Sequence, residues 1–399
     1  MIEKALAELT LNITDGKHGD CRGKDDSGYY FISCKDIREG QIHYEDARQI
    51  IEEDFWDTHK RTRLEPDDIL VTNSGTIGRM AFVRDVPLTY RTTFQKSVAI
   101  VKPDKAKIFP KYLYYQLQNC VDDFINRSNG AAQKNLLLST MRAFKMNIHE
   151  DEDLQMHIAA ILSAYDDLIE NNQKQIKLLE EAAQRLYKEW FIDLRFPGHE
   201  NVKIVDGVPE GWERMVLSEV TSILKRGISP KYSDNGKYSV INQKCIRSSI
   251  MDISESRRQE KEYVPTLNLQ DSDTVICSTG TGTLGRVGRV YGDYPNTTFD
   301  SHVTLVRAKE NPNYIYHVVK SQQEYLMGMG RGSTNQQELY RDVIERLVVL
   351  CPSQDILLKA ERVLNAIHCK IKAVYLQNNL LVESRDRLLP KLMSGELEV

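Results

Sequence analysis

Cysteine pairs, metal-binding spacings and long apolar runs are all missing from this sequence of 399 residues. Its seven cysteines form no CxxC pair, and its nine histidines show no HxxxH or HExxH spacing. Scattered thiols in an odd number argue against a disulfide framework and a zinc site, and they favour a reducing cytosol. No metal is predicted. No uncharged apolar run of about 18 residues predicts a membrane helix, and no signal peptide is indicated, so we expect a cytoplasmic protein.

Catalytic motifs are missing as well. There is no GxxxxGK[ST] phosphate loop and no N-P-P-[FY] motif of the kind expected in an adenine methyltransferase. The segment 280–285 matches GxGxxG, but the following RVGRVYGDYP predicts a strand, whereas a dinucleotide site needs a helix there. We therefore interpret this segment as a tight strand–loop–strand connection, and we predict no catalytic residue and no cofactor on this chain.

The charge is unevenly distributed, although the formal net charge is only −4. Residues 1–149 carry 22 Lys and Arg against 21 Asp and Glu, and residues 212–350 carry 18 against 16. Residues 150–194 carry 4 against 11. A polyanion should therefore avoid 150–194 and meet the other two segments. The alternative is that 150–194 is acidic only because it is solvated.

A long amphipathic helix is predicted over 153–191, which contains no Gly and no Pro. One apolar stripe recurs at steps of three and four, which is typical of a coiled-coil strand. At 1.5 Å per residue this helix would be nearly 60 Å long, an order-of-magnitude figure. The stripe consists of Leu154, Ile158, Ile161, Tyr165, Ile169, Asn172, Ile176, Leu179, Ala183, Leu186 and Trp190.

The same stripe occurs again about 200 residues later, so the sequence contains an internal repeat. An offset of 202 aligns Gly130 with Gly332 and Leu137 with Leu339, without a gap over some 60 residues. Each stripe contains one Asn, which is a common device for setting coiled-coil register. The second stripe consists of Ile356, Ala360, Val363, Ile367, Ile371, Val374, Asn378, Leu381, Arg385, Leu388 and Leu392.

The repeat continues upstream, so the chain is a duplicated unit of an α/β domain followed by a long helix. TTFQKSVAIV resembles TTFDSHVTLV, and LAELTLNITDG resembles LSEVTSILKRG. Short runs rich in Val, Ile, Phe and Tyr predict the strands, and a helix is predicted over 111–126. The predicted strands cover 29–33, 69–72, 80–83 and 97–101, and then 238–242, 274–277, 286–291 and 303–307.

At this point the chain resembles the specificity subunits of type I restriction-modification enzymes. The likeness rests on LVTNSGTIGR (70–79), STGTGTLGR (278–286), RLYKEWFIDLRFPG (185–198), VPEGWE (208–213) and LLPKLMSGEL (388–397). It implies two α/β target recognition domains and an intramolecular antiparallel coiled coil in a pseudo-two-fold, non-catalytic subunit. It also implies a bipartite, asymmetric target in double-stranded DNA. The implied protein partners are two modification subunits with S-adenosylmethionine, and restriction subunits with ATP and Mg.

The expected domain organisation follows from the repeat and the resemblance together. The first target recognition domain should cover 1–150, and the central long helix 151–195. A linker with two Pro and three Gly follows at 196–211. The second target recognition domain should then cover 212–350, and the distal long helix with its tail 351–399.

Four pairs of polar loops are the predicted DNA surface, because Arg, Lys, Asn and Gln read base edges and Ser and Thr contact phosphate. A surface salt bridge or a polar hairpin is the alternative for each loop. The first-domain candidates are Lys17, His18, Asn73, Ser74, Thr76, Arg79, Arg91, Thr92, Thr93, Gln95, Lys96, Gln133, Lys134 and Asn135. The second-domain candidates are Lys225, Arg226, Ser278, Thr279, Thr281, Thr283, Arg286, Asn296, Thr297, Thr298, His302, Ser333, Asn335, Gln336 and Gln337.

Two other functional classes stay open at the level of sequence. The chain could be a methyltransferase or nuclease fragment with its own active site, which a methylation assay on the isolated chain would reveal. It could also be a structural coiled-coil protein that does not bind DNA. That class predicts no sequence-selective DNA binding when a modification subunit is added.

Overall fold

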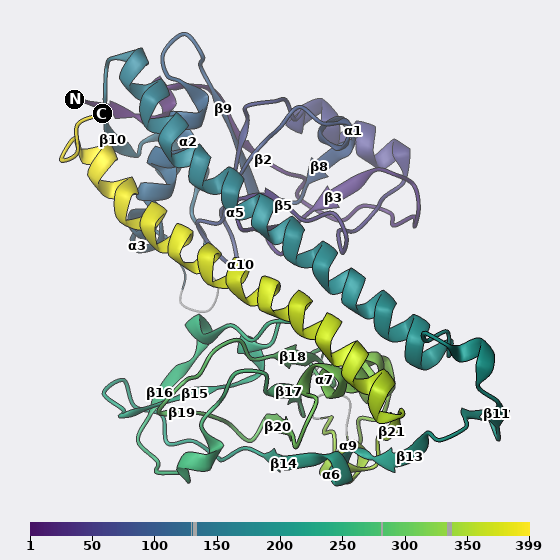
Figure 1. Ribbon diagram of the computed structural model, residues 1–399. Helices are drawn as coiled ribbons and strands as arrows, with labels where there is room; N and C mark the ends of the chain where they lie inside the picture. Colours follow the sequence, from purple (N-terminus) through teal and green to yellow (C-terminus); the bar gives the residue numbers. More distant parts are fainter. Residues whose placement is uncertain (129, 131–133, 281, 333–336) are drawn as a thin grey trace. The chain divides into compact units, whose positions relative to one another are not determined.

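The computed structural model describes every residue except 129, 131–133, 281 and 333–336. The chain divides into two compact units: unit 1 is Met1–Glu170 with Asn379–Val399, and unit 2 is Asn171–Asn378. Two long helices, α5 (Glu152–Tyr187) and α10 (Gln354–Ser394), each contribute one part to either unit (Figure 1). The predicted fold class, two α/β copies with two long helices, is confirmed.

Unit 1 contains an α/β domain built on an antiparallel four-stranded sheet in the order β2-β9-β6-β7. Its strands are β1 (Ile2–Ala5), β2 (Thr10–Asp15), β3 (Tyr30–Ile32), β4 (Ile37–Arg38), β5 (Gln41–Ile42), β6 (Ile69–Thr72), β7 (Met80–Phe82), β8 (Thr92–Phe94), β9 (Val98–Pro103) and β10 (Lys145–Ile148). Its short helices are α1 (Glu52–Thr62), α2 (Pro110–Asn119), α3 (Val121–Asn126) and α4 (Leu138–Arg142).

Unit 2 repeats this plan with a four-stranded antiparallel sheet in the order β14-β20-β17-β18. Its strands are β11 (Ile204–Val205), β12 (Val208–Pro209), β13 (Glu213–Val216), β14 (Thr221–Arg226), β15 (Tyr238–Ile241), β16 (Arg257–Gln259), β17 (Thr274–Cys277), β18 (Val287–Arg289), β19 (Thr297–Phe299), β20 (Val303–Ala308) and β21 (Val348–Cys351). Its short helices are α6 (Leu217–Val220), α7 (Pro312–Ser321), α8 (Gln323–Gly328) and α9 (Arg341–Glu345).

The predicted strands are confirmed, with ends shifted by a few residues, because each is an apolar run bounded by turn residues. Residues 69–72 and 274–277 form β6 and β17 with the predicted bounds. The helix predicted over 111–126 is interrupted at Cys120 and forms α2 and α3. The sequence reasoning did not predict α1, which carries Glu52, Glu53 and Asp54 in its first turn and basic residues in its last.

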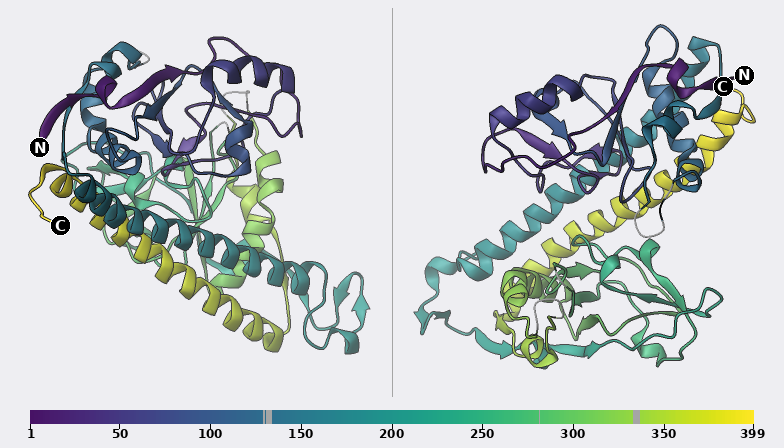
Figure 2. Two further views of the ribbon diagram at one scale, coloured as in Figure 1. Left: turned by 90° about the horizontal axis from the view of Figure 1, so that it is seen from above. Right: turned by 180° about the vertical axis from the view of Figure 1, so that it is seen from behind.

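In unit 1, the first part of α5 and the last part of α10 run side by side in opposite directions. Ile158 and Leu162 share a core with Leu392 and the domain's aromatic residues. The Arg385 guanidinium donates to the Asp166 carboxylate at 2.7 Å, and this carboxylate also accepts from the Tyr115 hydroxyl at 2.7 Å. Both ends of the chain lie in this unit (Figure 2).

In unit 2, the remaining helix parts are again antiparallel and pack on the second domain. The Asn172 amide lies 3.4 Å from the Gln377 side chain, so the single Asn of the first stripe is inside the helix pair. After Tyr187, α5 ends in a π-helical segment, Lys188–Ile192, which buries Phe191. Phe191 packs on Trp212 and Tyr314, so it forms a hydrophobic plug between the end of the helix and the second domain.

The predicted seam is right in its period and wrong at one position. The stripe residues Leu154, Ile158, Ile161, Ile169, Ile176, Leu179, Leu186, Ile356, Ile371, Leu381 and Leu388 are buried or half-buried. Val363, in contrast, is 44% exposed, and Leu364 is fully buried in its place. Two adjacent apolar residues satisfy a step of three or of four equally well, and only the packing decides between them.

Candidate nucleic-acid interface

The predicted loops converge at one end of each four-stranded sheet. In unit 1, the end of β2, the start of β9, the end of β6 and the start of β7 lie at the same end, because neighbouring strands are antiparallel. The segment before α4 joins them, since the Leu136 amide donates to the Asn73 carbonyl oxygen at 2.8 Å. The sheet thus brings together four loops that are separated by up to 120 residues of chain.

A pocket of about 490 Å³ opens at this end of the unit 1 sheet. Asp15 and Leu136 to Leu138 also line it, and none of these four residues was among the predicted DNA-contact residues. Leucine cannot hydrogen-bond a base, and an acidic residue, which can accept from the cytosine amino group, is common on any protein surface, so only their position marks these residues. The predicted residues that line the pocket are His18, Asn73, Ser74, Lys96 and Asn135.

The acidic residue at this pocket, Asp15, is contacted by two basic side chains. The Arg61 guanidinium donates to its Oδ1 at 2.6 Å, and His18 Nε2 lies 3.0 Å from its Oδ2. Arg61 comes from the last turn of α1, so this helix, which the sequence reasoning missed, reaches the pocket. Its charge pattern, three acids in the first turn and basic residues in the last, is the sequence signal that indicates this helix.

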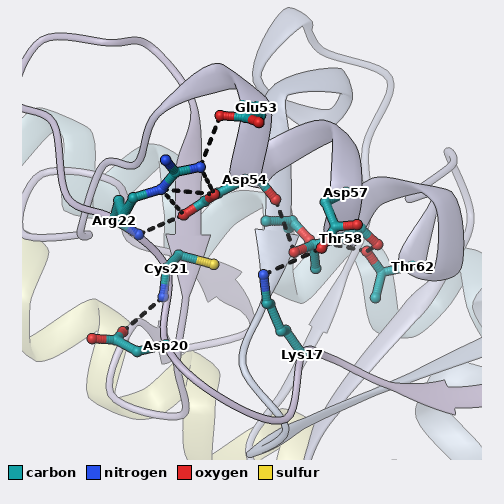
Figure 3. Close-up of polar contacts among 10 residues, drawn as sticks. Lys17, Asp20, Cys21, Arg22, Glu53, Asp54, Asp57, Thr58 and Thr62 are labelled. Atoms are coloured by element: carbon teal, nitrogen blue, oxygen red, sulfur yellow. Dashed lines mark hydrogen bonds and ion pairs between the residues drawn. The ribbon is translucent and has the colours of Figure 1, made fainter.

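Helix α1 also fixes the loop that carries Lys17 and Arg22 (Figure 3). The Arg22 guanidinium and backbone amide both donate to the Asp54 carboxylate, at distances from 2.6 to 3.3 Å. These hydrogen bonds hold the pKa of the Asp54 carboxyl at about 2. A further ion pair joins Lys17 to Asp57 at 3.3 Å. The loop is therefore ordered by charge-assisted hydrogen bonds before any ligand arrives.

The matching end of the unit 2 sheet is occupied by side-chain contacts. Arg226, the last residue of β14, forms an ion pair with Glu338. Thr279 Oγ1 and His302 Nδ1 form a hydrogen bond, and the Ser278 amide donates to the His302 carbonyl oxygen at 2.7 Å. Burial raises the pKa of the neighbouring Asp300 carboxyl.

The structure agrees with one pairing of the repeat and corrects another. Gly16 and Gly227, which align in the repeat, occupy equivalent places, where a Cβ would lie 2.1 Å from the Phe94 oxygen and 2.2 Å from the Phe299 oxygen. Arg226 therefore matches Asp15, and the loop candidates Lys17 and His18 follow this position in unit 1. The bridges Ser74 to Asn135 and Thr279 to Glu338 likewise match Asn135 with Glu338, at an offset of 203 instead of 202.

Several predicted contacts are wrong because their side chains are buried in the domain core. Thr92, Thr93, Thr297 and Thr298 lie on β8 and β19, and Ser278 follows β17, all at 5% exposure or less. The Thr93 hydroxyl bonds Thr62 and the Ser278 hydroxyl bonds Thr304. In a pleated strand a buried hydroxyl satisfies a neighbour in the fold, so these residues shape the loops and offer no atoms to DNA.

Arg91 and Asn296 are exposed but lie at the far end of their short strands, away from the converging loops. The Arg91 guanidinium packs over the Tyr29 ring at 5.9 Å. The structure does not bring these two residues to the loop cluster.

The remaining candidates lie on the loops themselves. Arg79 and Arg286 stand at the starts of β7 and β18, half-exposed, and neither guanidinium has a hydrogen bond or ion pair among the described residues. Within the described residues, neither arginine forms the surface salt bridge that was the alternative to DNA contact. Exposed or half-exposed loop and strand-end positions are also found for Thr76, Gln95, Lys134, Lys225, Thr283 and Gln337. Gln133, Thr281, Ser333, Asn335 and Gln336 lie outside the described residues.

The GxGxxG match at 280–285 is not a dinucleotide site. The chain returns directly from β17 to β18, with the Cys277 amide donating to the Arg286 carbonyl oxygen at 2.9 Å. No helix follows to hold a pyrophosphate, so the predicted strand–loop–strand connection is confirmed. In the described part of the chain, no three His, Cys, Asp or Glu side chains gather to hold a metal ion. Nor is any described helix long and apolar enough to cross a membrane.

Comparison with known proteins gives one consistent result. Residues 20–181 and 209–356 match the family described as type I restriction modification DNA specificity domain. The chain is 28% identical over 348 residues to the type I restriction enzyme MjaIX specificity subunit of Methanocaldococcus jannaschii, across 83% of this chain and 78% of that relative. It is 23% identical over 376 residues to the type I restriction enzyme HindI specificity subunit of Haemophilus influenzae, across 75% and 80%.

A solved structure with a similar fold is the type I restriction-modification system S subunit from M. genitalium. The TM-score is 0.57 at 16% identity, and the match covers 98% of this chain and 96% of that chain. At this identity the likeness concerns the fold alone.

Proposed function

Since the chain belongs to the type I restriction modification DNA specificity domain family, we propose that it is the DNA-specificity subunit of a type I restriction-modification complex. Each α/β domain reads one half of a bipartite, asymmetric double-stranded DNA target. The observation that carries this proposal is the duplicated sheet end, which presents polar loops in both units and different side chains in each. Different side chains on equal scaffolds are suited to two different half-sites.

The readers in this proposal are the loop residues that remain accessible. In unit 1 they surround the pocket of Ser74, Lys96 and Asn135. In unit 2 they are Arg226, Thr279 and His302, together with Glu338. Arg79 and Arg286, whose guanidinium groups have no protein partner among the described residues, are suited to phosphate or guanine.

The long helices serve as a spacer and as a docking platform for two modification subunits, in the same proposal. The strongly acidic segment 150–194 disfavours DNA and is suited to protein. The subunit itself is non-catalytic and works in the cytoplasm. S-adenosylmethionine belongs to the modification subunits, and ATP and Mg belong to the restriction subunits. The domain limits 1–150, 151–195, 196–211, 212–350 and 351–399 describe this division of labour.

Methylome sequencing of cells with and without this gene tests the proposal. We expect a bipartite adenine-methylation motif that disappears when the gene is deleted. An unchanged methylome would refute the proposal. Methylation by the isolated chain with S-adenosylmethionine would instead favour the alternative of a self-contained methyltransferase.

The spacer role has its own test. Deleting about one helical turn within 173–182, together with a matching turn of α10, keeps the two helices paired. We expect a changed spacer length and unchanged half-sites. A changed half-site identity with an unchanged spacer would contradict the spacer role.

A further inference from the structure

At the sheet end of unit 2 an ion pair joins Arg226 to Glu338, whereas the equivalent Asp15 of unit 1 pairs with Arg61 and lies 3.0 Å from His18 Nε2. Nη1 of Arg226 donates to Glu338 Oε1 across 112 residues of chain. Backbone contacts fix both partners: Nε of Arg226 donates to the Ser301 carbonyl oxygen at 2.5 Å, and Glu338 exchanges two backbone hydrogen bonds with Arg331, at 2.9 and 3.0 Å. The guanidinium and the carboxylate are therefore held in fixed positions before DNA arrives.

Both side chains keep atoms available for a ligand. The Arg226 side chain is 30% exposed and the Glu338 side chain 36% exposed. Neither Nη2 of Arg226 nor Oε2 of Glu338 has a partner within the described residues. The pair thus presents unused N–H donors next to an unused carboxylate acceptor.

The major-groove edge of one base pair matches this order of groups. Guanine offers two neighbouring acceptors, N7 and O6, and its paired cytosine offers the N4 amino donor beside them. A guanidinium can donate to both guanine acceptors while the carboxylate accepts from the cytosine amino group. At an A·T pair, the second guanidinium donor would face the adenine N6 amino group, which is also a donor. The pair therefore discriminates against A·T.

A purely structural role for the ion pair does not explain the difference between the units. In unit 1, the equivalent residues Asp15 and Asn135 form no ion pair with each other. The same junction is closed there by backbone hydrogen bonding, Leu136 to Asn73 at 2.8 Å, and unit 2 has the equivalent bond from Leu339 to Ser278 at 2.8 Å. The backbone junction is therefore the same in both units and does not depend on an ion pair between these two positions.

We propose that the Arg226–Glu338 ion pair reads a G·C base pair in the second half-site, with Arg226 on guanine and Glu338 on cytosine. This inference rests on the proposed function and adds the chemistry of one position. The first half-site has no reader of this kind, because Asp15 is engaged by Arg61 and His18.

Methylome sequencing of cells that carry the full complex tests the inference with Arg226→Gln, Arg226→Lys and Glu338→Gln. We expect the wild-type second half-site to contain a G·C pair that Arg226→Gln relaxes. Methylation at sites with that pair, relative to sites without it, should fall by about 5- to 150-fold. Arg226→Lys should lose part of the preference for sites with the G·C pair, because an ammonium group lacks the bidentate geometry of a guanidinium. The first half-site and the spacer should not change.

The matched control is Arg247→Gln, which breaks the Arg247–Glu255 ion pair at 3.5 Å in the same unit. Residues next to this pair contact the end of β18 that is remote from the converging loops. We expect the wild-type motif from this variant. The inference is overturned if Arg226→Gln keeps the wild-type motif, or if it lowers methylation equally at all sites together with the melting temperature. A bipartite wild-type motif without a G·C pair in either half would overturn the inference alone, whereas no motif at all would overturn the proposed function as well.

Discussion

Unit 1 and unit 2 build the same sheet end and fill it differently. Gly16 and Gly227 allow the same close backbone approach to the ends of β8 and β19, which carry Thr-Thr-Phe in both domains. On this common frame, unit 1 opens a pocket of about 490 Å³, while unit 2 carries the Arg226–Glu338 ion pair. Backbone and core therefore define the frame, and the exposed loop side chains are free to change. Such a division lets one fold read two DNA sequences.

The largest effect should come from the shared frame. Phe94→Ala and Phe299→Ala each remove a fully buried ring beneath the loops. Each should destabilise its own unit by about 3–5 kcal/mol, because the cavity cannot close. Hydrogen exchange resolved by residue, combined with urea titration, measures each unit separately. Equal loss of protection in both units after one substitution would show that the frames are not independent.

The second largest effect should be a loss of stability of unit 2 at acidic pH. In unit 2, His317 Nε2 and His368 Nε2 lie 3.0 Å apart, and His368 Nδ1 lies 2.8 Å from the Tyr291 hydroxyl. Burial, reinforced by the charges of Arg289 and Lys320, lowers the pKa of His317 to about 3. Burial with Arg289 and His317 lowers that of His368 to about 2. Glu180 is the acidic group beside Lys320 and Tyr291.

Both folded-state pKa values lie below 6.5, so below that pH the unfolded chain binds more protons than the folded one. Stability is full above pH 6.5 and falls progressively as the pH drops toward about 3. Between pH 7 and pH 5 the loss should be about 2–4 kcal/mol. Urea unfolding at several pH values measures this loss, with His157→Gln, at an exposed position on α5, as the control. A pH dependence that survives replacement of both buried histidines would contradict this assignment.

A smaller, local effect is expected at the loop of unit 1. Arg22→Gln removes the hydrogen bonds that tie residues 17–22 to Asp54. Amide exchange in this loop should accelerate by about tenfold, since the loop loses its charged anchor. Lys24→Gln, an exposed change two residues away, is the control and should leave the exchange unchanged. If the first half-site stayed fully specific despite a faster loop, preorganisation by α1 would not matter for reading.

The smallest effect should come from a single exposed cation. Lys96→Gln should weaken DNA binding of the assembled complex uniformly across sequences and reduce the slope of log K against log salt by about 1. Lys105→Gln is the control, because Lys105 lies beyond the opposite end of β9 and pairs with Asp67. A changed motif, in place of a uniform loss of binding, would show that Lys96 contacts a base. Lys96 and Arg226 would then both be base-contacting residues.

Much of the frame could be predicted because its signals are local. Strands β6 and β17 are apolar runs between turn residues, and the helical stripes repeat every three to four residues. The helix α1 was missed because its single buried aromatic, Phe55, gives no stripe over 11 residues. The offset of 202 differs by one from the structural match because Leu136, Leu137 and Leu138 allow either alignment. The first copy has one more residue than the second between the preceding strand and the long helix.

The sequence by itself determined the duplication, the strand and helix types and the polar character of the loops, because these depend on residues close together in the chain. Only the tertiary structure decided which loop residues share a site. Buried Thr92 and Thr298 look the same in sequence as exposed Thr76, since exposure depends on strands that pair across distant segments. Arg226 and Glu338 meet because antiparallel pairing brings the ends of β14 and β17 to the same end of the sheet, 112 residues apart in the chain.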